Sequence, residues 1–206
     1  MKDTEHSTAI NWHYIAVALI FAATILLMVL YMPAIKEFDM AVLKAAQSIS
    51  LPFLQYIPAL MSELDRNYYV WPIIVSGGIM VSHRYYLKTF LLVFFTQAAF
   101  VLSRFIKGIV CRQRPCGDAY PGYSFPSNHA LTSMCFYGIL IYLIHRHVSG
   151  FWKYVLITLL GLLILLTDFS RLSLGVHFPT DVLEGMFIGF IMVNLYIILD
   201  KFFSRR

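Results

Sequence analysis

Three short segments of this chain combine residue types that could bind and transfer a phosphoryl group. They span residues 107–115, 126–129 and 170–181, and they bring together lysine and arginine cations, two histidines and an aspartate. Fixed cations bind anions, and the planar guanidinium group of arginine matches two phosphate oxygens at once. A histidine can attack a phosphorus atom or donate a proton to a leaving group. These residue types therefore indicate a phosphate site with catalytic capacity.

The expected anion clamp draws on all three segments. Lys107 and Arg114 are seven residues apart, so two helical turns would place them on the same face. Arg171 adds a third cation. Ser127 and Asn128 stand at the expected start of a helix, where free backbone N–H groups favour a phosphate. We therefore expect phosphate to be bound by Lys107, Arg114, Ser127, Asn128 and Arg171.

The two histidines have different surroundings, which predicts different roles. Asp181 follows His177 by four residues and is near enough to accept a hydrogen bond from its imidazole. Such a bond fixes the tautomer and leaves the other ring nitrogen free to attack. His129 has no comparable carboxylate neighbour, and unequal environments separate the pKa values of an acid and a base. We expect His177, His129 and Asp181 to be the catalytic residues.

The segments that must position these residues are strongly apolar. The chain has 206 residues, of which 59% are hydrophobic and only 13% charged, whereas soluble domains carry about 25% charged residues. Six apolar runs are visible, and the stretch from Tyr14 to Ile35 exceeds the roughly 20 residues that cross a bilayer. The sequence predicts an all-α integral membrane bundle of six transmembrane helices that forms a single domain over 1–206. The runs are 12–32, 67–82, 88–109, 128–145, 152–170 and 181–199.

Six spans would place both termini on one side of the membrane and the three polar segments on the other. The first polar segment ends the third run, the second opens the fourth, and the third bridges the fifth and sixth. When the clamp cations are set aside, the remaining lysines and arginines favour cytoplasmic termini. We therefore expect a multi-pass protein of the cell inner (cytoplasmic) membrane, with its site on the non-cytoplasmic face.

The region from Lys36 to Asn67, between the first two runs, carries a helical pattern. It predicts either an interfacial amphipathic helix or an ordinary extramembrane loop helix, and the pattern leaves both open. The proposed apolar face holds Phe38, Val42, Ala45, Ala46 and Ile49, opposite Lys36, Asp39, Lys44 and Gln47.

The three segments resemble the signature of the type-2 phosphatidic acid phosphatase (PAP2) family. That signature reads Lys-x6-Arg-Pro, Pro-Ser-Gly-His and Ser-Arg-x5-His-x3-Asp, and this chain matches it from Lys107 to Asp181 except at Asn128, where glycine is usual. The resemblance implies that His177 takes the phosphoryl group, Asp181 orients it, and His129 protonates the leaving oxygen. It also implies a clamp of Lys107, Arg114, Ser127 and Arg171, with no metal and no cofactor. The asparagine leaves this chemistry intact and bears on substrate size.

The expected function is hydrolysis of a phosphate or diphosphate head group on a membrane lipid. Undecaprenyl diphosphate is slightly preferred over phosphatidylglycerophosphate, phosphatidic acid and lipid A. One alternative is a phosphotransferase that passes the phosphoryl group to another lipid or sugar. Another is a non-catalytic protein that binds or transports lipid phosphates, although binding alone needs no nucleophile. The expected partners are the bilayer and the lipid phosphate, and nucleic acid is not expected because the basic residues flank apolar runs. The oligomeric state is left open.

Several further polar residues have two interpretations each. Arg104, three residues before Lys107, could touch the head group, although snorkelling toward the interface is the simpler account. Asp168 and Glu184 could form ion pairs that steady Arg171. Cys111 and Cys116 could form a local disulfide if their compartment is oxidising, or remain free thiols.

Overall fold

The computed structural model describes residues 6–31, 34–49, 70–82 and 85–204. Within those ranges every regular element is a helix, which confirms the predicted all-α class. The helices are α1 (His6–Tyr31), α2 (Ala34–Ser48), α4 (Val70–Ser82), α5 (Tyr86–Val110), the short 3-10 helix η1 (Gly117–Ala119), α6 (Asn128–His147), α7 (Phe151–Ser173) and α8 (Pro179–Phe203).

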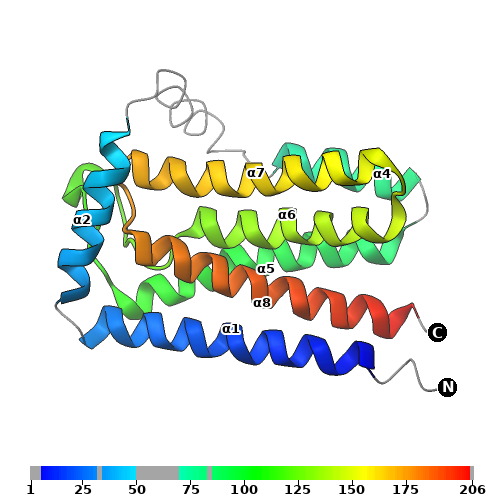
Figure 1. Cartoon of the computed structure of the whole chain (residues 1–206), viewed down its shortest axis with the longest axis horizontal. Helices are drawn as coiled ribbons and strands as arrows, with labels where there is room; N and C mark the ends of the chain where they lie inside the picture. Colours follow the sequence, from blue (N-terminus) through cyan, green and yellow to red (C-terminus); the bar gives the residue numbers. More distant parts are fainter. Residues whose placement is uncertain (1–5, 32–33, 50–69, 83–84, 205–206) are drawn as a thin grey trace.

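The long helices run side by side, and α2 lies across one end of the bundle (Figure 1). Helix α6 is central and packs against α5, α7 and α8, while α1 covers α8 and α2 contacts α7 and α8. The start of α1 and the end of α8 lie together at the end opposite α2 (Figure 1). The ends of α5 and α7 and the starts of α6 and α8 therefore meet beside α2, as the predicted topology requires.

Among the described residues, three helices are long and apolar enough to cross a membrane, namely α5, α7 and α8. Their outer faces expose large apolar side chains such as Phe105, Ile109 and Leu165, each more than half exposed. Exposed apolar surface of this extent is stable in a lipid environment and costly in water. The structure thus supports membrane embedding for these helices, and the count of six spans stays a prediction.

Helices α6 and α8 approach closely where they leave the polar end of the bundle. Gly185 and Gly189 are four residues apart on α8, and a Cβ at either would lie within 2.7 Å of a backbone oxygen of Ser127 or Leu131. Small residues at this spacing allow helix backbones to come together inside a membrane. In addition, the Ser127 N–H donates to the Asp181 carbonyl oxygen at 2.9 Å. This contact brings the second and third polar segments together.

The orientation of α2 corrects one feature of the sequence analysis. The helical pattern grouped Asp39 with the polar face, yet its side chain is fully buried, while Phe38 is 56% exposed. The reason is an ion pair between Asp39 and Arg112, which turns the Asp39 side chain toward the bundle. Residues 50–69 of the predicted Lys36–Asn67 segment lie outside the described part of the chain. The interfacial position of α2 stays a prediction.

Candidate active site

A cavity of about 220 Å³ opens where the three polar segments converge. Arg114, His129, Arg171 and His177 come from different elements of the bundle, yet all four side chains line this space. The structure therefore brings together most of the residues that the sequence analysis selected. The complete lining is Phe100, Arg104, Lys107, Arg114, Tyr120, Asn128, His129, Arg171, Val176 and His177.

Lys107 lies in the last turn of α5, but the predicted helix does not continue to Arg114, because α5 ends at Val110 where Cys111 adopts a left-handed backbone conformation. Arg114 instead reaches the cavity from the loop that connects α5 to α6, and backbone carbonyl oxygens of this loop and of the α7–α8 connection hold both side chains. The Lys107 ammonium group donates to the carbonyl oxygens of Tyr123 at 2.8 Å and Ser124 at 3.0 Å. The Arg114 guanidinium donates to the carbonyl oxygens of Gly122 at 3.1 Å and Val176 at 2.8 Å. These carbonyl oxygens accept hydrogen bonds but carry no net charge, so they fix the two side chains at the cavity without adding a counter-charge.

The His177 ring lies between Arg114 and Asp181. Its Nε2 is 3.3 Å from Arg114 Nη1, and its Nδ1 is 3.6 Å from Asp181 Oδ2. Because a guanidinium group only donates, this contact requires an unprotonated Nε2 and places the proton on Nδ1, facing Asp181. Burial lowers the pKa of His177 to about 4, with further lowering by Lys107 and Arg114 and an opposing effect of Asp181. This lowered pKa favours the neutral form of His177 near pH 7, with the lone pair on Nε2.

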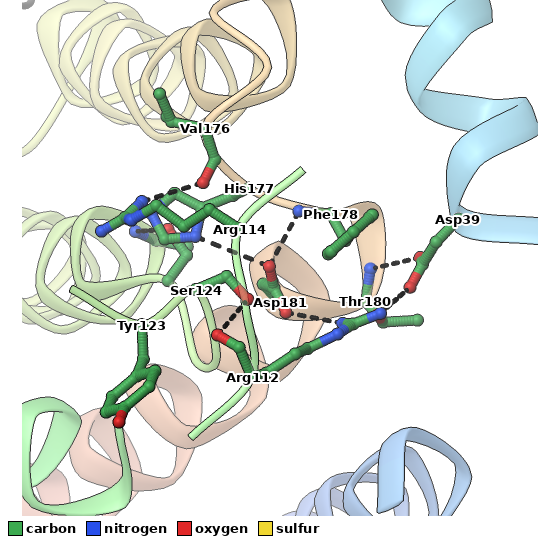
Figure 2. A network of polar contacts seen from close by, with 12 residues as sticks. Asp39, Arg112, Arg114, Tyr123, Ser124, Val176, His177, Phe178, Thr180 and Asp181 are labelled. Atoms are coloured by element: carbon green, nitrogen blue, oxygen red, sulfur yellow. Dashed lines mark hydrogen bonds and ion pairs between the residues drawn. The ribbon is translucent and has the colours of Figure 1, made fainter. Parts of the chain in front are cut away.

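Asp181 is fixed by donors on both carboxylate oxygens (Figure 2). Its Oδ2 accepts from the Phe178 backbone N–H at 2.8 Å, an arrangement that caps the start of α8. Its Oδ1 accepts from Arg112 Nη1 at 2.7 Å. Pro179 begins the helix, where its missing N–H costs nothing. The local sequence of α8 thus aims Asp181 back at His177.

Arg112 is a site residue that sequence reasoning missed. It bridges two buried carboxylates, since its Nη2 is 2.6 Å from Asp39 Oδ2 and its Nη1 bonds Asp181 (Figure 2). Thr180 completes the network: its hydroxyl accepts from Arg112 at 2.8 Å and donates to Asp39 at 2.6 Å. The only signal in the sequence is a further cation between Lys107 and Arg114, and the sequence pattern does not indicate that Asp39 and Asp181 are its partners.

Of the remaining predicted phosphate ligands, Asn128 and Arg171 line the cavity, whereas Ser127 is not part of its described lining. His129 and Asn128 line the cavity, and the Asn128 Oδ1 is buried without a hydrogen-bond partner among the described residues. Arg171 lines the cavity although only 2% exposed, with its Nε donating to the Ser170 hydroxyl at 3.0 Å. Ser127 is fully buried and is absent from the described lining, because its hydroxyl caps α6 by accepting from the Ala130 N–H at 3.4 Å.

The structure also places the polar residues for which the sequence analysis left two interpretations open. Arg104 lines the cavity. Asp168 and Glu184 are buried, and neither Asp168 oxygen nor Glu184 Oε2 has a hydrogen-bond partner in the described part of the chain. Asp168 therefore accepts no hydrogen bond from Arg171 in the described part of the structure. Cys111 and Cys116 are free thiols.

Similarity to known proteins agrees with this geometry. Residues 85–204 match the PAP2 superfamily. Phosphatidylglycerophosphatase B of Bacillus subtilis (strain 168) is 30% identical over 204 residues, which cover 93% of this chain and 98% of that protein. Lipid phosphate phosphatase delta of Arabidopsis thaliana is 29% identical over 82 residues, covering 38% of this chain and 20% of that protein.

A solved structure resembles the whole bundle. The crystal structure of the first transmembrane PAP2 type phosphatidylglycerolphosphate phosphatase from Bacillus subtilis aligns with a TM-score of 0.76 and 27% identity. The alignment covers 93% of this chain and 96% of that one. Because the family match spans more than half of the chain and the site residues converge as its signature predicts, this chain belongs to the PAP2 superfamily and is a membrane-embedded lipid phosphatase.

Proposed function

We propose that the protein hydrolyses the terminal phosphate of its lipid substrate through a phosphohistidine at His177. The observation that carries the proposal is the placement of the His177 ring at the cavity, with its Nε2 3.3 Å from Arg114 Nη1 and its Nδ1 3.6 Å from Asp181 Oδ2. In the first step Nε2 forms a bond to phosphorus, and the bond from phosphorus to the lipid oxygen breaks. His129 gives its proton to that oxygen. In the second step water attacks phosphorus, His129 takes a proton from the water, and the N–P bond breaks to release inorganic phosphate.

The charge of the transferring phosphoryl group is matched by the cations around the cavity. Lys107, Arg114 and Arg171 line the cavity in which the equatorial oxygens of the phosphoryl group would lie. Positioned cations of this kind stabilise charge that is spread over the transferred group, which is the main requirement of phosphoryl transfer. Rotation of the Asn128 amide would offer a further N–H donor. We propose that these cations suffice and that the reaction needs no metal.

Phosphatidylglycerophosphate is the substrate that we place first. The reason is the near full-length similarity to a protein named phosphatidylglycerophosphatase B. Undecaprenyl diphosphate, which the sequence analysis preferred, now takes second place, because that preference rested on the compact chain and the expected outward-facing site, and neither feature identifies one particular lipid. We further propose that the site lies on the non-cytoplasmic face of the inner membrane with cytoplasmic termini. The common end of α1 and α8 supports termini on one side of the membrane (Figure 1).

The test is phosphate release from dioctanoyl phosphatidylglycerophosphate by detergent-purified protein in the presence of EDTA. We expect His177→Ala to lower kcat by several orders of magnitude, as loss of a nucleophile does. His145→Ala is the matched control, since His145 is exposed in the last turn of α6. Activity of His177→Ala above a tenth of the wild-type value would sink the assignment. Loss of activity in EDTA that magnesium or zinc restores would contradict the metal-independent mechanism, and release of phosphorylated acceptor instead of phosphate would identify a transferase.

A further inference from the structure

The cavity extends along α5 beyond the cations that surround His177. Lys107, Arg104 and Phe100 all line it, and their spacing of three and four residues places them on one face of the helix. With a rise of 1.5 Å per residue, Arg104 lies about 4.5 Å and Phe100 about 10 Å from Lys107 along the axis. This face of α5 is therefore cationic near the C-terminal end of the helix, at Lys107 and Arg104, and becomes aromatic toward the middle of the helix, at Phe100.

Arg104 has no anionic partner among the described residues. Its side chain is exposed, and its contact is with the Phe100 ring, whose centroid lies 5.7 Å from the guanidinium carbon. By contrast, Arg112 binds Asp39 and Asp181. An arginine on an apolar helix is costly unless it reaches the interface or binds a partner. Its guanidinium is thus available to an anion that enters the cavity.

The position of Arg104 fits the part of a lipid head group that follows the terminal phosphate. When that phosphate sits at His177 among Lys107, Arg114 and Arg171, the rest of the head group must continue toward the apolar surface. It passes Arg104 first and Phe100 next. A lipid with one phosphate would present an uncharged ester to Arg104, whereas a lipid with two phosphates would present a second anion, which a guanidinium group binds strongly.

We propose that Arg104 binds a second phosphate, the one that stays on the lipid product. The site then selects lipids that carry two phosphates, as a phosphodiester plus a terminal monoester or as a diphosphate, over simple phosphomonoesters. Phe100 packs against the first part of the lipid that follows. The proposal rests on the function proposed above, since it assumes that the terminal phosphate lies at His177.

The test compares two substrates that differ by this phosphate. Phosphate release is measured with dioctanoyl phosphatidylglycerophosphate and with dioctanoyl phosphatidic acid for wild type, Arg104→Gln and Arg104→Lys. Loss of a charge-assisted hydrogen bond predicts that Arg104→Gln lowers kcat/KM about 10- to 100-fold for the first lipid. The change for phosphatidic acid is expected to be less than about twofold. Arg104→Lys should recover part of the selectivity, and Lys36→Gln, an exposed cation on α2, controls for a general loss of positive charge.

A second measurement needs no turnover. Dioctanoyl phosphatidylglycerol keeps only the second phosphate, so native mass spectrometry should show weaker binding of this lipid to Arg104→Gln than to wild type. Equal losses with both substrates, or unchanged binding of phosphatidylglycerol, would overturn the proposal and leave Arg104 as a snorkelling residue. If wild type releases phosphate from neither lipid, the proposed function fails, and the binding measurement still decides the role of Arg104.

Discussion

Replacement of Arg112 by glutamine should both destabilise the fold and slow catalysis. The guanidinium group bridges Asp39 and Asp181, whose side chains are fully buried. Removal of one partner from a buried ion pair costs about 3–5 kcal/mol. The Arg112 side chain is 13% exposed, so water relieves part of the cost, and we expect a loss of about 3 kcal/mol in the free energy of unfolding. For a chain of this size that corresponds to a fall in Tm of roughly 10 °C.

The kinetic effect should appear in kcat and hardly in KM. Without the bond to Arg112, Asp181 Oδ1 loses its donor, and the carboxylate can turn away from His177 Nδ1. A displacement of about 1 Å at a catalytic group costs on the order of 100-fold in rate. KM should change little because Arg112 is not part of the described cavity lining. The assay is steady-state phosphate release, with activity normalised to the folded fraction.

Arg146→Gln provides a matched control. Arg146 is 3.3 Å from the buried carboxylate of Asp200, at the opposite end of the bundle from the cavity. It should lower Tm while leaving kcat of the folded protein unchanged. The double variant Asp39→Asn/Arg112→Gln should be less destabilised than the sum of the two single variants, with a coupling of about 0.5–3 kcal/mol. Wild-type kcat in folded Arg112→Gln, or additive effects in the double variant, would refute the coupling between α2 and Asp181.

Three further outcomes follow from the structure. In the proposed mechanism the neutral form of His177 is the nucleophile. After correction for the ionisation of the substrate phosphate, kcat/KM should therefore be retained as pH falls and be lost only through about pH 4. A loss of kcat/KM near the ordinary pKa of histidine would contradict a buried His177. Gly185→Val should destabilise the fold by about 1–3 kcal/mol or more, because its side chain would meet backbone atoms of α6, and Gly161→Val, with open space around its Cβ, is the control in thermal unfolding. In a variant without native cysteines, a cysteine at Gly122 should react with an impermeant maleimide in intact cells and one at Ser149 should not; the reverse pattern would invert the proposed topology.

Part of the site was predictable because it depends on residue types in fixed order. His177 lies just before α8 and Asp181 in its first turn, and Lys107 lies in the last turn of α5. The expected helix through Arg114 is not formed, and Arg114 reaches the cavity from the loop after α5. Helices form from local spacing, and an up-and-down bundle must bring such ends to one side of the molecule. The convergence of Lys107, Arg114, His129, Arg171 and His177 on one cavity therefore agrees with the sequence analysis.

Other features depended on neighbours that local patterns do not identify. Ser127 was expected to bind phosphate, yet its hydroxyl is used to cap α6, because a helix start offers both roles to the same side chain. The close packing of α8 on α6 rests on Gly185 and Gly189, whose spacing was present in the sequence but gained meaning only when the facing backbone was known. Asp39 was assigned to the polar face of α2, because a charged side chain is normally solvated. The periodicity of α2 could not show that Arg112 lies opposite Asp39 and pairs with it in the interior.

The sequence by itself determined the helical class, the apolar composition suited to a membrane, the order of the polar segments and the pairing of His177 with Asp181, because these follow from composition and from spacing within single turns of helix. Only the tertiary structure decided that Asp39 reaches Arg112, a residue 73 positions away, and that Arg112 in turn holds Asp181. It also decided that Arg104 lines the cavity. Such contacts depend on how helices distant in sequence dock and rotate against one another, and side-chain periodicity along one helix carries no information about the residue that will face it.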